Sequence, residues 1–306
     1  MSETKNRPKD THFRQQTLTG YQPIYSARMV SIIFFVSAML FFAFGFPLYV
    51  SSERVVEVSK RYDDDCGKSN KICQISIKID KKIPEPVYVY YKLENFYQNH
   101  RLYVRSRSYT QLRNGDPTDT ELNLCSPAKY NEDFKGYTTK TGLKNRDIAV
   151  PCGMVARSVF NDTYDIPGYD IDFDDLVYES DKNIWVNGDE SKQWRKINDA
   201  LRIWMKISPF STFRKLYGVI KSDVKKGTLV INVENNYDVN DWDGKKFIVL
   251  SSASVFGGKN NKLGIIFISA GCVCILCALI FLVMGWLRSS KVSESLSAED
   301  LKKLKF

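Results

Sequence analysis

The sequence predicts a membrane protein in which two transmembrane helices flank one large ectodomain, an antiparallel, α+β domain that is rich in strands and stabilised by disulfides. The helices are predicted by residues 29–50 and 263–287, which contain no Asp, Glu, Lys, Arg or His. The ectodomain is predicted by four cysteines and by alternating strand patterns between these two stretches.

The two uncharged stretches are long enough to cross a bilayer. At 1.5 Å per residue they reach about 33 and about 37 Å, and a hydrocarbon core is about 30 Å thick. Residues 29–50 follow a polar segment and end without a small-residue cleavage pattern, which favours an uncleaved signal anchor over a signal peptide. Small side chains in the second stretch favour packing against a partner in the membrane: Gly264, Ser269, Ala270, Gly271, Ala278 and Gly285.

These helices divide the chain into five segments. We predict an N-terminal tail, a first helix, an ectodomain, a second helix and a C-terminal tail at residues 1–28, 29–50, 51–262, 263–287 and 288–306. Two spans leave both tails on one side of the membrane. The positive-inside rule does not decide which side, because Lys and Arg also flank the spans on the ectodomain side and long loops translocate regardless of charge.

Cysteine usage indicates the compartment of the ectodomain. Four of the seven cysteines fall in residues 51–262, namely Cys66, Cys73, Cys125 and Cys152. An even number in a long soluble segment fits two disulfides in an oxidising environment. Three connectivities are open, and we expect nearest-neighbour pairing, Cys66–Cys73 and Cys125–Cys152, which closes two self-contained loops. Loop-closure entropy gives these bonds about 2.5 and about 3.5 kcal/mol.

One sequon for N-glycosylation lies in the same segment. Asn161-Asp162-Thr163 has the acceptor pattern, so we expect a glycan on Asn161. Together with the paired cysteines, it indicates that the ectodomain is lumenal or extracellular and that both tails are cytosolic.

Three further cysteines lie inside the second helix. Cys272, Cys274 and Cys277 have a spacing that resembles a metal motif, but no His, Asp or Glu lies near them. Buried thiols behave as small apolar groups. We interpret these cysteines as packing residues and predict no metal site.

The ectodomain is expected to consist mainly of strands. Residues 72–79 alternate between apolar and polar side chains, and residues 87–93, 228–233 and 246–250 are rich in β-branched and aromatic residues. Because Asn- and Gly-rich turn residues separate the last two strands, we expect them to pair as an antiparallel hairpin.

Helices and loops are expected between the strands. Residues 199–206 predict an amphipathic helix with Leu201, Trp204 and Met205 on one face. Residues 55–60 are expected to continue the first membrane helix briefly, and residues 110–190 to be rich in loops.

Charge excludes a nucleic-acid-binding protein. The net charge of +9 is spread over both tails and the ectodomain, with no concentrated basic stretch. Mildly basic tails suit anionic membrane lipids or an acidic partner surface.

Catalytic and cofactor motifs are absent from the sequence. His12 and His100 fall on opposite sides of the predicted membrane, which excludes His-based triads. No phosphate-binding loop, dinucleotide fingerprint or nucleophile elbow occurs. The acidic residues at 170–175 lack the glycine and glutamate of a calcium loop, so we interpret them as a solvated turn. We predict no catalytic residue and no cofactor.

Five motifs, taken in order, carry a family resemblance. Residues 7–16 read Arg-Pro-Lys-Asp-Thr-His-Phe-Arg-Gln-Gln, and residues 90–101 read Tyr-Tyr-Lys-Leu-Glu-Asn-Phe-Tyr-Gln-Asn-His-Arg. Pro-Cys-Gly follows at 151–153, Phe-Asn-Asp-Thr at 160–163 and Phe-Gly-Gly-Lys-Asn-Asn at 256–261. This series resembles the accessory (beta) subunit family of phospholipid-flipping type IV P-type ATPases.

The resemblance implies a function and a partner. It implies a non-catalytic subunit, bound one-to-one to the ATPase catalytic chain, that is needed for folding of the pump, its exit from the endoplasmic reticulum and its transport cycle. It implies residence in the endoplasmic reticulum, Golgi, endosome or plasma membrane. The implied partner-binding residues are Arg7, Phe13, Arg14 and Gln15 in the tail, Asn95, Phe96, Tyr97, Asn99, His100 and Arg101 in the ectodomain, and Gly257, Gly258, Lys259, Asn260 and Asn261 before the second helix.

Two other classes of protein share this topology. A two-span ligand-gated channel usually has more ectodomain disulfides and a polar pore lining, and forms symmetric oligomers. A membrane-anchored receptor or lectin is expected to be stable without a partner. Chain stoichiometry and the presence of a pump after purification in mild detergent distinguish these three classes.

Overall fold

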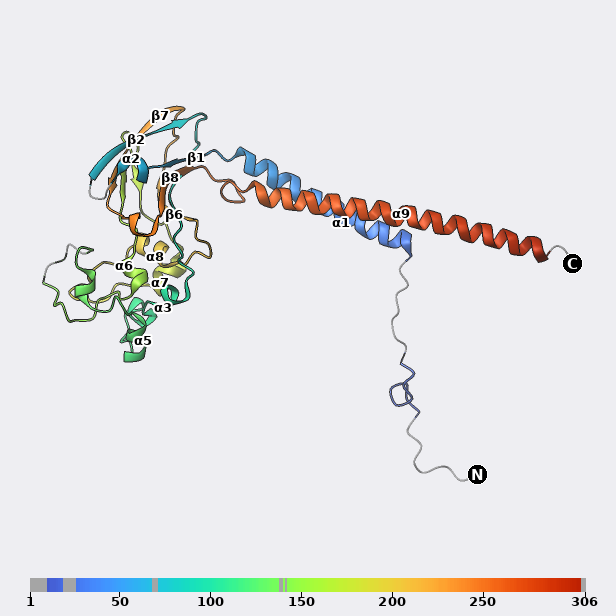
Figure 1. Ribbon diagram of the computed structural model, residues 1–306, viewed down its shortest axis with the longest axis horizontal. Helices are drawn as coiled ribbons and strands as arrows, with labels where there is room; N and C mark the ends of the chain where they lie inside the picture. The colour runs from blue at the N-terminus through green and yellow to red at the C-terminus, as the bar shows by residue number, and fades with distance from the viewer. Residues whose placement is uncertain (1–9, 19–25, 68–70, 138–139, 141, 304–306) are drawn as a thin grey trace, which may run out of the picture. The chain divides into compact units, whose positions relative to one another are not determined.

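The computed structural model describes residues 10–18, 26–67, 71–137, 140 and 142–303, with side chains up to residue 288. The chain divides into two units (Figure 1). One contains the two long helices, with residues up to 49 and from 261 onward, and the other is the ectodomain, residues 50–260.

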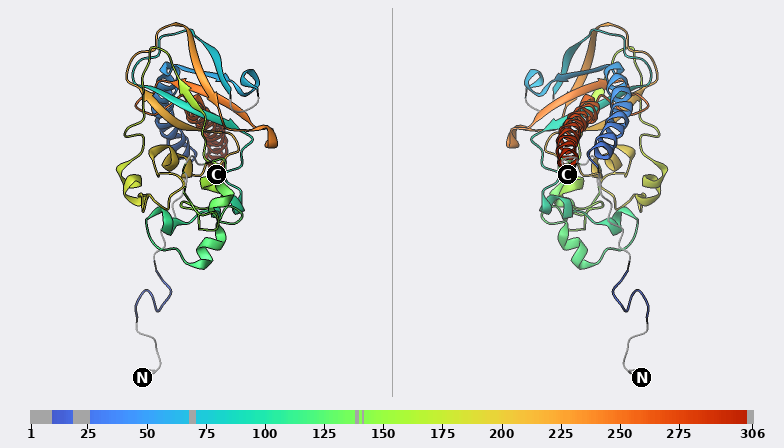
Figure 2. Two further views of the ribbon diagram at one scale, coloured as in Figure 1. Left: turned by 90° about the vertical axis from the view of Figure 1, so that its left-hand side faces the viewer. Right: turned by 90° about the vertical axis from the view of Figure 1, so that its right-hand side faces the viewer.

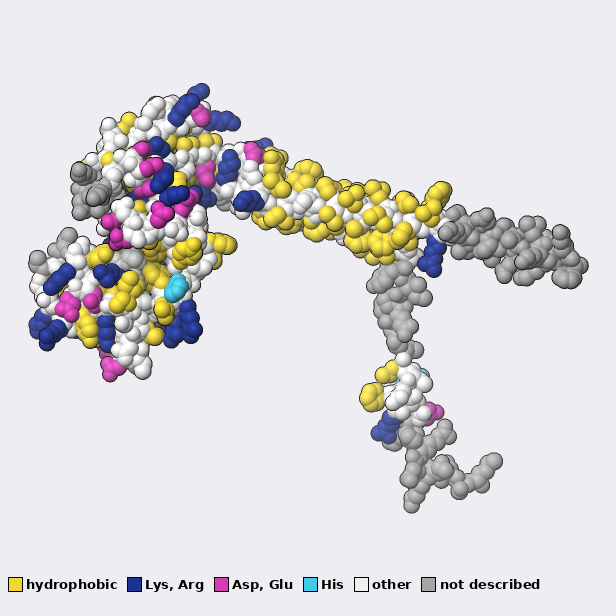
Figure 3. Space-filling view, viewed as in Figure 1, with side chains coloured by type: hydrophobic (Ala, Val, Ile, Leu, Met, Phe, Trp, Pro, Cys, Tyr) yellow, Lys and Arg dark blue, Asp and Glu magenta, His cyan; other side chains and the backbone are white. Residues whose placement is uncertain are grey.

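Two helices are long and apolar enough to cross a membrane. Helix α1 spans Ala27–Arg54 and α9 spans Asn261–Lys303, of which Asn261–Arg288 has the composition of a membrane span. Apolar side chains cover both helices along this length (Figure 3). They run side by side in both views of Figure 2. The predicted fold class, two transmembrane helices around a β-rich ectodomain, is confirmed.

Small residues lie between α1 and α9 at every seventh position. On α1 they are Ser31, Ala38 and Gly45, and on α9 they are Gly264, Gly271, Ala278 and Gly285. A Cβ added to most of these glycines would lie within 3 Å of the opposite helix, with Gly45 against Ile268, Gly264 against Tyr49 and Gly271 against Phe42. Ser31 Oγ donates a hydrogen bond to the Ala278 carbonyl at 2.8 Å.

This arrangement corrects one expectation from the sequence. Gly264, Gly271, Ala278 and Gly285, which we expected to face a partner, form the contact between the two helices of the chain itself. The reason is physical: lipid tails provide no hydrophobic drive for two helices to associate, so close backbone approach at small residues supplies the attraction. Ser269 is exposed, and its hydroxyl donates to the Ile266 carbonyl of its own helix.

The larger sheet of the ectodomain has five strands in the order β1-β8-β3-β6-β5. Its strands are β1 Glu57–Arg61, β8 Lys245–Ser251, β3 Val87–Glu94, β6 Phe213–Ile220 and β5 Ile171–Asp172. All neighbours are antiparallel. Strand β3 alternates buried and half-buried residues along its whole length, which is the pattern of a strand with one face on the core.

The smaller sheet has three strands in the order β2-β7-β4. They are β2 Lys71–Ile79, β7 Gly227–Asn235 and β4 Thr163–Asp165, again antiparallel. The inward-facing residues of β2 and β7 join the core that the larger sheet also covers. The four strands predicted from the sequence are therefore present as β2, β3, β7 and β8.

Two local predictions were wrong. The expected hairpin of the last two strands does not form, because β7 pairs with β2 and β4 while β8 pairs with β1 and β3. The connection between them is fixed in the ectodomain by buried Val239 and by Tyr237, so it links two sheets instead of making a tight turn. The helix does not continue over 55–60 either. It ends at Arg54, and β1 begins at Glu57 because Val56 and Val58 pack on the core and the backbone pairs with β8.

Short helices and loops make up the other end of the ectodomain (Figure 1). They are α3 Arg101–Arg105, α4 Tyr109–Leu112, α5 Asp119–Leu124, η1 Asn131–Phe134, α6 Met154–Arg157, α7 Glu179–Ile184 and α8 Asp199–Met205. Helix α2, Asp63–Cys66, instead packs beside β2 and β8, and η2, Asn240–Trp242, lies in the connection before β8. Helix α8 buries Leu201, Trp204 and Met205, as its periodicity predicts. Disulfides Cys66–Cys73 and Cys125–Cys152, the expected pairs, join α2 to β2 and α5 to the loop before α6.

Candidate functional site

The predicted contact residues of the tail are exposed where the structure describes them. Phe13 is 77% exposed, and Arg14 and Gln15 are also exposed. A local turn holds them, in which the Gln15 N–H donates to the Thr11 carbonyl at 2.9 Å. Arg7 lies outside the described residues. An aromatic ring and a cation exposed on a short turn suit contact with another protein.

The ectodomain segment 95–101 separates into two groups, and the first is used inside the fold. Asn95 adopts a left-handed conformation, and its amide donates to the Trp242 carbonyl at 2.8 Å. The Asn99 amide donates to the Pro209 carbonyl at 2.8 Å. The Phe96 ring packs edge-to-face on Trp242, with ring centroids 5.1 Å apart. These three residues fix the shape of the segment.

The second group in this segment is exposed. Tyr97 is 59% exposed, and His100 and Arg101 are exposed at the start of α3. Phe210, which the sequence reading did not select, is 72% exposed in the loop that hydrogen-bonds to this segment. Aromatic and cationic side chains of this kind are enriched at protein interfaces.

The segment before α9 forms a tight turn. Ser254 and Gly257 exchange backbone hydrogen bonds at 2.8 and 2.9 Å, and Gly257 has a φ of +99° that an L side chain rarely adopts. Gly257, Lys259 and Asn260 are exposed, and Gly258 and Asn261 are half-buried. At the tip of the turn, Val255 is 98% and Phe256 66% exposed. The sequence reading did not select these two apolar residues.

The family motifs around Cys152 are internal. Gly153 has a φ of +102°, and a Cβ there would clash with the Ser106 carbonyl. The Cys152 N–H donates to Gln111 Oε1 at 2.9 Å, and Trp194 Nε1–H donates to the Pro151 carbonyl at 2.6 Å. Residues 151–153 therefore connect the segments that contain Ser106, Gln111 and Trp194 to the second disulfide, Cys125–Cys152.

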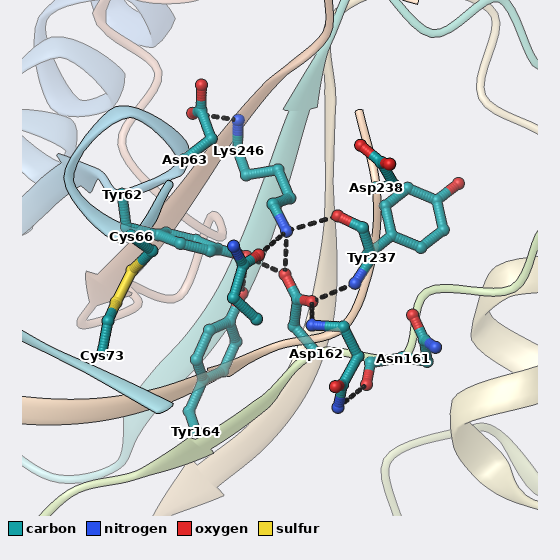
Figure 4. Close-up of polar contacts among 12 residues, drawn as sticks. Tyr62, Asp63, Cys66, Cys73, Asn161, Asp162, Tyr164, Tyr237, Asp238 and Lys246 are labelled. Atoms are coloured by element: carbon teal, nitrogen blue, oxygen red, sulfur yellow. Dashed lines mark hydrogen bonds and ion pairs between the residues drawn. A yellow bond between two sulfur atoms is a disulfide. The ribbon is translucent and has the colours of Figure 1, made fainter. Parts of the chain in front are cut away.

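A buried ion pair lies behind the sequon (Figure 4). Lys246 on β8 and Asp162, just before β4, approach within 2.7 Å, and their side chains are 1% and 0% exposed. Asp162 also accepts hydrogen bonds from the Tyr62 hydroxyl at 2.7 Å and from the backbone N–H groups of Asn236 and Tyr237 at 2.6 and 2.5 Å. Each oxygen of the Asp162 carboxylate therefore accepts two hydrogen bonds.

The Lys246 ammonium has further hydrogen-bond acceptors besides Asp162. Its ammonium donates to Asn235 Oδ1 and, at 2.5 Å, to the Tyr237 carbonyl. Burial lowers the pKa of Lys246, and Asp162 acts in the opposite direction. Burial also raises the pKa of the Tyr62 and Tyr164 phenols well above the usual range. Neutral phenols that donate toward a fully surrounded carboxylate indicate a structural role for this cluster, which we call the Asp162 network.

Two buried cations hold the carboxyl end of α8. The Lys215 ammonium donates to the carbonyls of Ile203 at 3.0 Å, Trp204 at 2.9 Å and Lys206. The Arg107 guanidinium donates to the Met205 carbonyl at 2.8 Å. Cations at a helix C-terminus satisfy its free carbonyls and its dipole. Burial, together with the nearby Lys206 and Arg107 charges, lowers the pKa of Lys215 to about 7.

The acidic residues at 170–175 pair with lysines. Asp175 accepts from Lys182 at 2.5 Å, and Asp172 pairs with Lys221. Within the described part of the chain, no group of three or more His, Cys, Asp or Glu is arranged to hold a metal ion.

Fold and sequence together define a two-pass membrane protein with one large, disulfide-braced ectodomain. Residues 48–291 match the model of the LEM3 (ligand-effect modulator 3) family / CDC50 family. The chain therefore belongs to the CDC50/LEM3 family, the beta subunits of phospholipid flippases, and the family predicted from the motifs is confirmed.

Its relatives match over nearly their whole length. The chain is 33% identical to ALA-interacting subunit 3 of Arabidopsis thaliana, with 95% of this chain and 90% of the relative covered. It is 35% identical to putative ALA-interacting subunit 4 of the same plant, over 90% and 88%. It is 31% identical to cell cycle control protein 50A of Bos taurus, over 91% and 89%.

Proposed function

We propose that this chain is the non-catalytic accessory subunit of a phospholipid-flipping type IV P-type ATPase. It forms a one-to-one heterodimer with the catalytic chain and is needed for folding of the pump, its exit from the endoplasmic reticulum and its transport cycle. The observation that carries the proposal is similarity over nine-tenths of the chain to proteins named ALA-interacting subunits.

Apart from Asn95 and Asn99, which are tied to the ectodomain by hydrogen bonds, the exposed members of the predicted sites are the proposed contacts. On the cytosolic side these are Phe13, Arg14 and Gln15. On the other side they are Tyr97, His100 and Arg101, with the turn at 254–260. Asn95, Phe96 and Asn99 hold the shape of the first ectodomain contact through the hydrogen bonds and ring packing described above. We also propose Arg7, which lies outside the described residues, as a contact of the tail with the partner.

The proposed topology has the ectodomain in the lumen or outside the cell and both tails in the cytosol. Two disulfides in the ectodomain support an oxidising compartment. Asn161 is exposed, so its amide is open to carry a glycan. We propose that the heterodimer works in the Golgi, endosome or plasma membrane after leaving the endoplasmic reticulum.

The chemistry of pumping belongs to the partner in this proposal. The membrane helices present apolar and small side chains, and the buried ammonium groups of Lys246 and Lys215 in the ectodomain are held by internal ion pairs and hydrogen bonds. The subunit acts by holding lumenal loops and membrane helices of the pump in a competent arrangement.

Purification in mild detergent with identification of the partner tests this proposal. The full chain is expected to recover one P-type ATPase chain per copy. When the pump is co-expressed, the glycan of the subunit is expected to mature to endoglycosidase-resistant forms. Symmetric oligomers of the chain alone, or efficient maturation in cells without any such pump, would contradict it.

A matched pair of variants tests the ectodomain contact. Tyr97→Ala is expected to lower recovery of the ATPase several-fold without changing the thermal stability of the subunit. Tyr178, a tyrosine that is 79% exposed elsewhere, provides the control, and Tyr178→Ala is expected to leave recovery unchanged. Equal recovery with both variants would remove Tyr97 from the interface.

A further inference from the structure

A groove of about 760 Å³ lies beside the sequon, between the region around α6 and the connection that precedes β8. Its walls combine aromatic and polar side chains, and the residues that matter here are Phe96, Tyr137, Arg157, Asn161, Tyr237 and Trp242. Its size is that of a small-molecule site, and such sites combine apolar walls with a few polar groups. Phe96 and Trp242 also hold the shape of the first proposed ectodomain contact, but the proposed function assigns no ligand to the groove itself.

Arg157 supplies a cation to the wall of the groove. Its side chain lines the groove and is half-buried. Its guanidinium lies 5.2 Å from the centre of the exposed Tyr137 ring. Cation and ring together offer a hydrogen-bond donor and an apolar face to a ligand, and hydrogen bonds from charged donors contribute about 1.5–3 kcal/mol.

Asn161, the residue that would carry the glycan, lies at the rim of the groove. Asn161 lines the groove and is exposed, whereas the next residue, Asp162, is locked into the buried network. The Asn161 carbonyl also accepts from the Asn236 amide at 3.4 Å. Asp162 holds the backbone of Asn236 and Tyr237, which belongs to the opposite wall. The Asp162 carboxylate therefore fixes the position of Asn161, where the glycan would be attached, relative to residues 236 and 237 of the groove.

We propose that this groove binds the first N-acetylglucosamine residues of the glycan on Asn161. The C–H faces of the sugar would pack on Trp242 and Tyr137, and an acetamide or hydroxyl oxygen would accept from the Arg157 guanidinium. Asp238 and Asp241 at the groove supply acceptors for sugar hydroxyls. The inference rests on the proposed lumenal placement of the ectodomain, because only there is Asn161 glycosylated.

Covalent attachment makes such binding effective even when each contact is weak. A tethered ligand meets its site at an effective concentration in the millimolar range, so affinity that is negligible for free sugar is sufficient here. The bound glycan would cover an aromatic surface that water otherwise meets. It would also place the outer sugars in a defined direction from the ectodomain.

Native deglycosylation of the full chain in complex with its pump measures this binding. An endoglycosidase that cuts at the asparagine-linked sugar is expected to act slowly on the folded complex. Tyr137→Ala is expected to speed cleavage about tenfold, the factor that corresponds to a lost contact of about 1.4 kcal/mol. Arg157→Gln is expected to do the same, and Tyr178→Ala provides the control outside the groove.

A stability cycle supplies a second readout. Removing the glycan is expected to lower the unfolding temperature of the wild-type complex more than that of the Tyr137→Ala complex, because the variant has already lost the sugar contact. Equal cleavage rates in all three variants, with equal loss of stability, would overturn the inference. So would a cleavage rate that responds to removal of the pump and not to Tyr137→Ala, because a pump loop would then fill the groove.

Glycan mass separates this inference from the proposed function. Asn161→Gln is expected to remove the mass of one glycan. A chain that lacks a glycan on Asn161 yet still co-purifies with a P-type ATPase would overturn the groove inference alone. A chain that carries the glycan in the groove but recovers no ATPase would overturn the proposed function alone.

Discussion

The helix pair and the ectodomain hold together in opposite ways. Between α1 and α9, small residues at every seventh position allow the backbones to approach closely, with one hydrogen bond from Ser31 to the Ala278 carbonyl. Two ring pairs, Phe34–Phe281 and Phe41–Phe267, flank these small residues. Inside the ectodomain the contacts are large aromatic rings, such as Tyr91 stacked on Phe160 with centroids 4.0 Å apart, and buried charges such as Lys246.

The difference follows from the solvent of each unit. In lipid, side chains gain nothing by leaving the solvent, so the helices associate through close approach. In water, burying aromatic surface is favourable, and the charges buried with it must be fully paired. The helix pair is therefore sensitive to added atoms, and the ectodomain to removed ones. Three predictions test this contrast.

The largest effect is expected in the Asp162 network. Asp162→Ala keeps the sequon but leaves the Lys246 ammonium buried without its carboxylate, which typically costs 3–5 kcal/mol of folding free energy. Thermal unfolding of the purified chain measures the loss, and in cells the variant is expected to keep an immature glycan.

An exposed ion pair provides the control for this variant. Lys78 and Asp80 lie 3.4 Å apart with side chains 83% and 76% exposed, so Asp80→Ala is expected to have little effect. Replacing both members of the buried pair, with Asp162→Leu and Lys246→Met, is expected to recover part of the loss. If Asp162→Ala unfolds at the same temperature as Asp80→Ala, the network is not a stabilising element.

An intermediate effect is expected from adding atoms between the helices. A Cβ on Gly271 would lie 2.8 Å from the Phe42 ring, so Gly271→Leu forces α1 and α9 apart. Overpacking of this kind costs about 1–3 kcal/mol. We expect the pair to separate or shift its register, with reduced recovery of the ATPase.

Cross-linking reports this change directly. Cysteines placed at Ser31 and Ala278, in a chain whose native helix cysteines are replaced by alanine, are expected to form a disulfide, and Gly271→Leu is expected to reduce its yield several-fold. Val273 is 58% exposed on the same helix, so Val273→Phe is the control and should not change the yield. Unchanged cross-linking with leucine at position 271 would show that the small residues are not required.

The smallest effect is a pH dependence in the ectodomain. Lys215 has a pKa of about 7 in the fold, against an ordinary value of 10.5, so above pH 7 the folded chain releases a proton that the unfolded chain still binds. The free energy of unfolding therefore rises with pH in this window, by about 1 kcal/mol from pH 7 to pH 8.

A variant isolates this contribution. Lys215→Met removes the titrating group, so the difference in unfolding free energy between pH 7 and pH 8 should be smaller in the variant by that amount. Other titrating groups are common to both proteins and cancel. The same slope in both proteins would show that Lys215 does not titrate in this range.

The comparison also explains what the sequence could predict. Strand β2 was predictable because alternation reports which face of a strand is buried, and β3, β7 and β8 because β-branched and aromatic residues favour strands. Their partners were not, because alternation contains no information on which strands are neighbours, and the expected hairpin was wrong for that reason. Strand β1 was missed because it begins only three residues after α1 ends.

The functional residues also differ in how far the sequence could predict them. The Asp162 network could not be foreseen, because a lysine at the start of a strand and an aspartate in a sequon usually face solvent. The seven-residue spacing of Gly264, Gly271, Ala278 and Gly285 was visible in the sequence, and the matching series on α1 was the signal that could have assigned it to the helix pair. Family motifs indicated the site segments, but all four of Asn95, Tyr97, Asn99 and Arg101 are exposed, and only the hydrogen bonds of the two asparagine amides to Trp242 and Pro209 assign them to holding the shape of the segment.

The most direct test of the account is the lipid-stimulated ATP hydrolysis of the purified pump with and without this subunit. The chain alone is expected to hydrolyse no ATP, and the heterodimer is expected to turn over. Alanine at Phe13 and Arg14 is expected to slow turnover while the complex stays intact. The account predicts that the pump loses lipid-stimulated activity when the subunit is removed and regains it when the subunit is restored. Full activity of the pump after removal would contradict it.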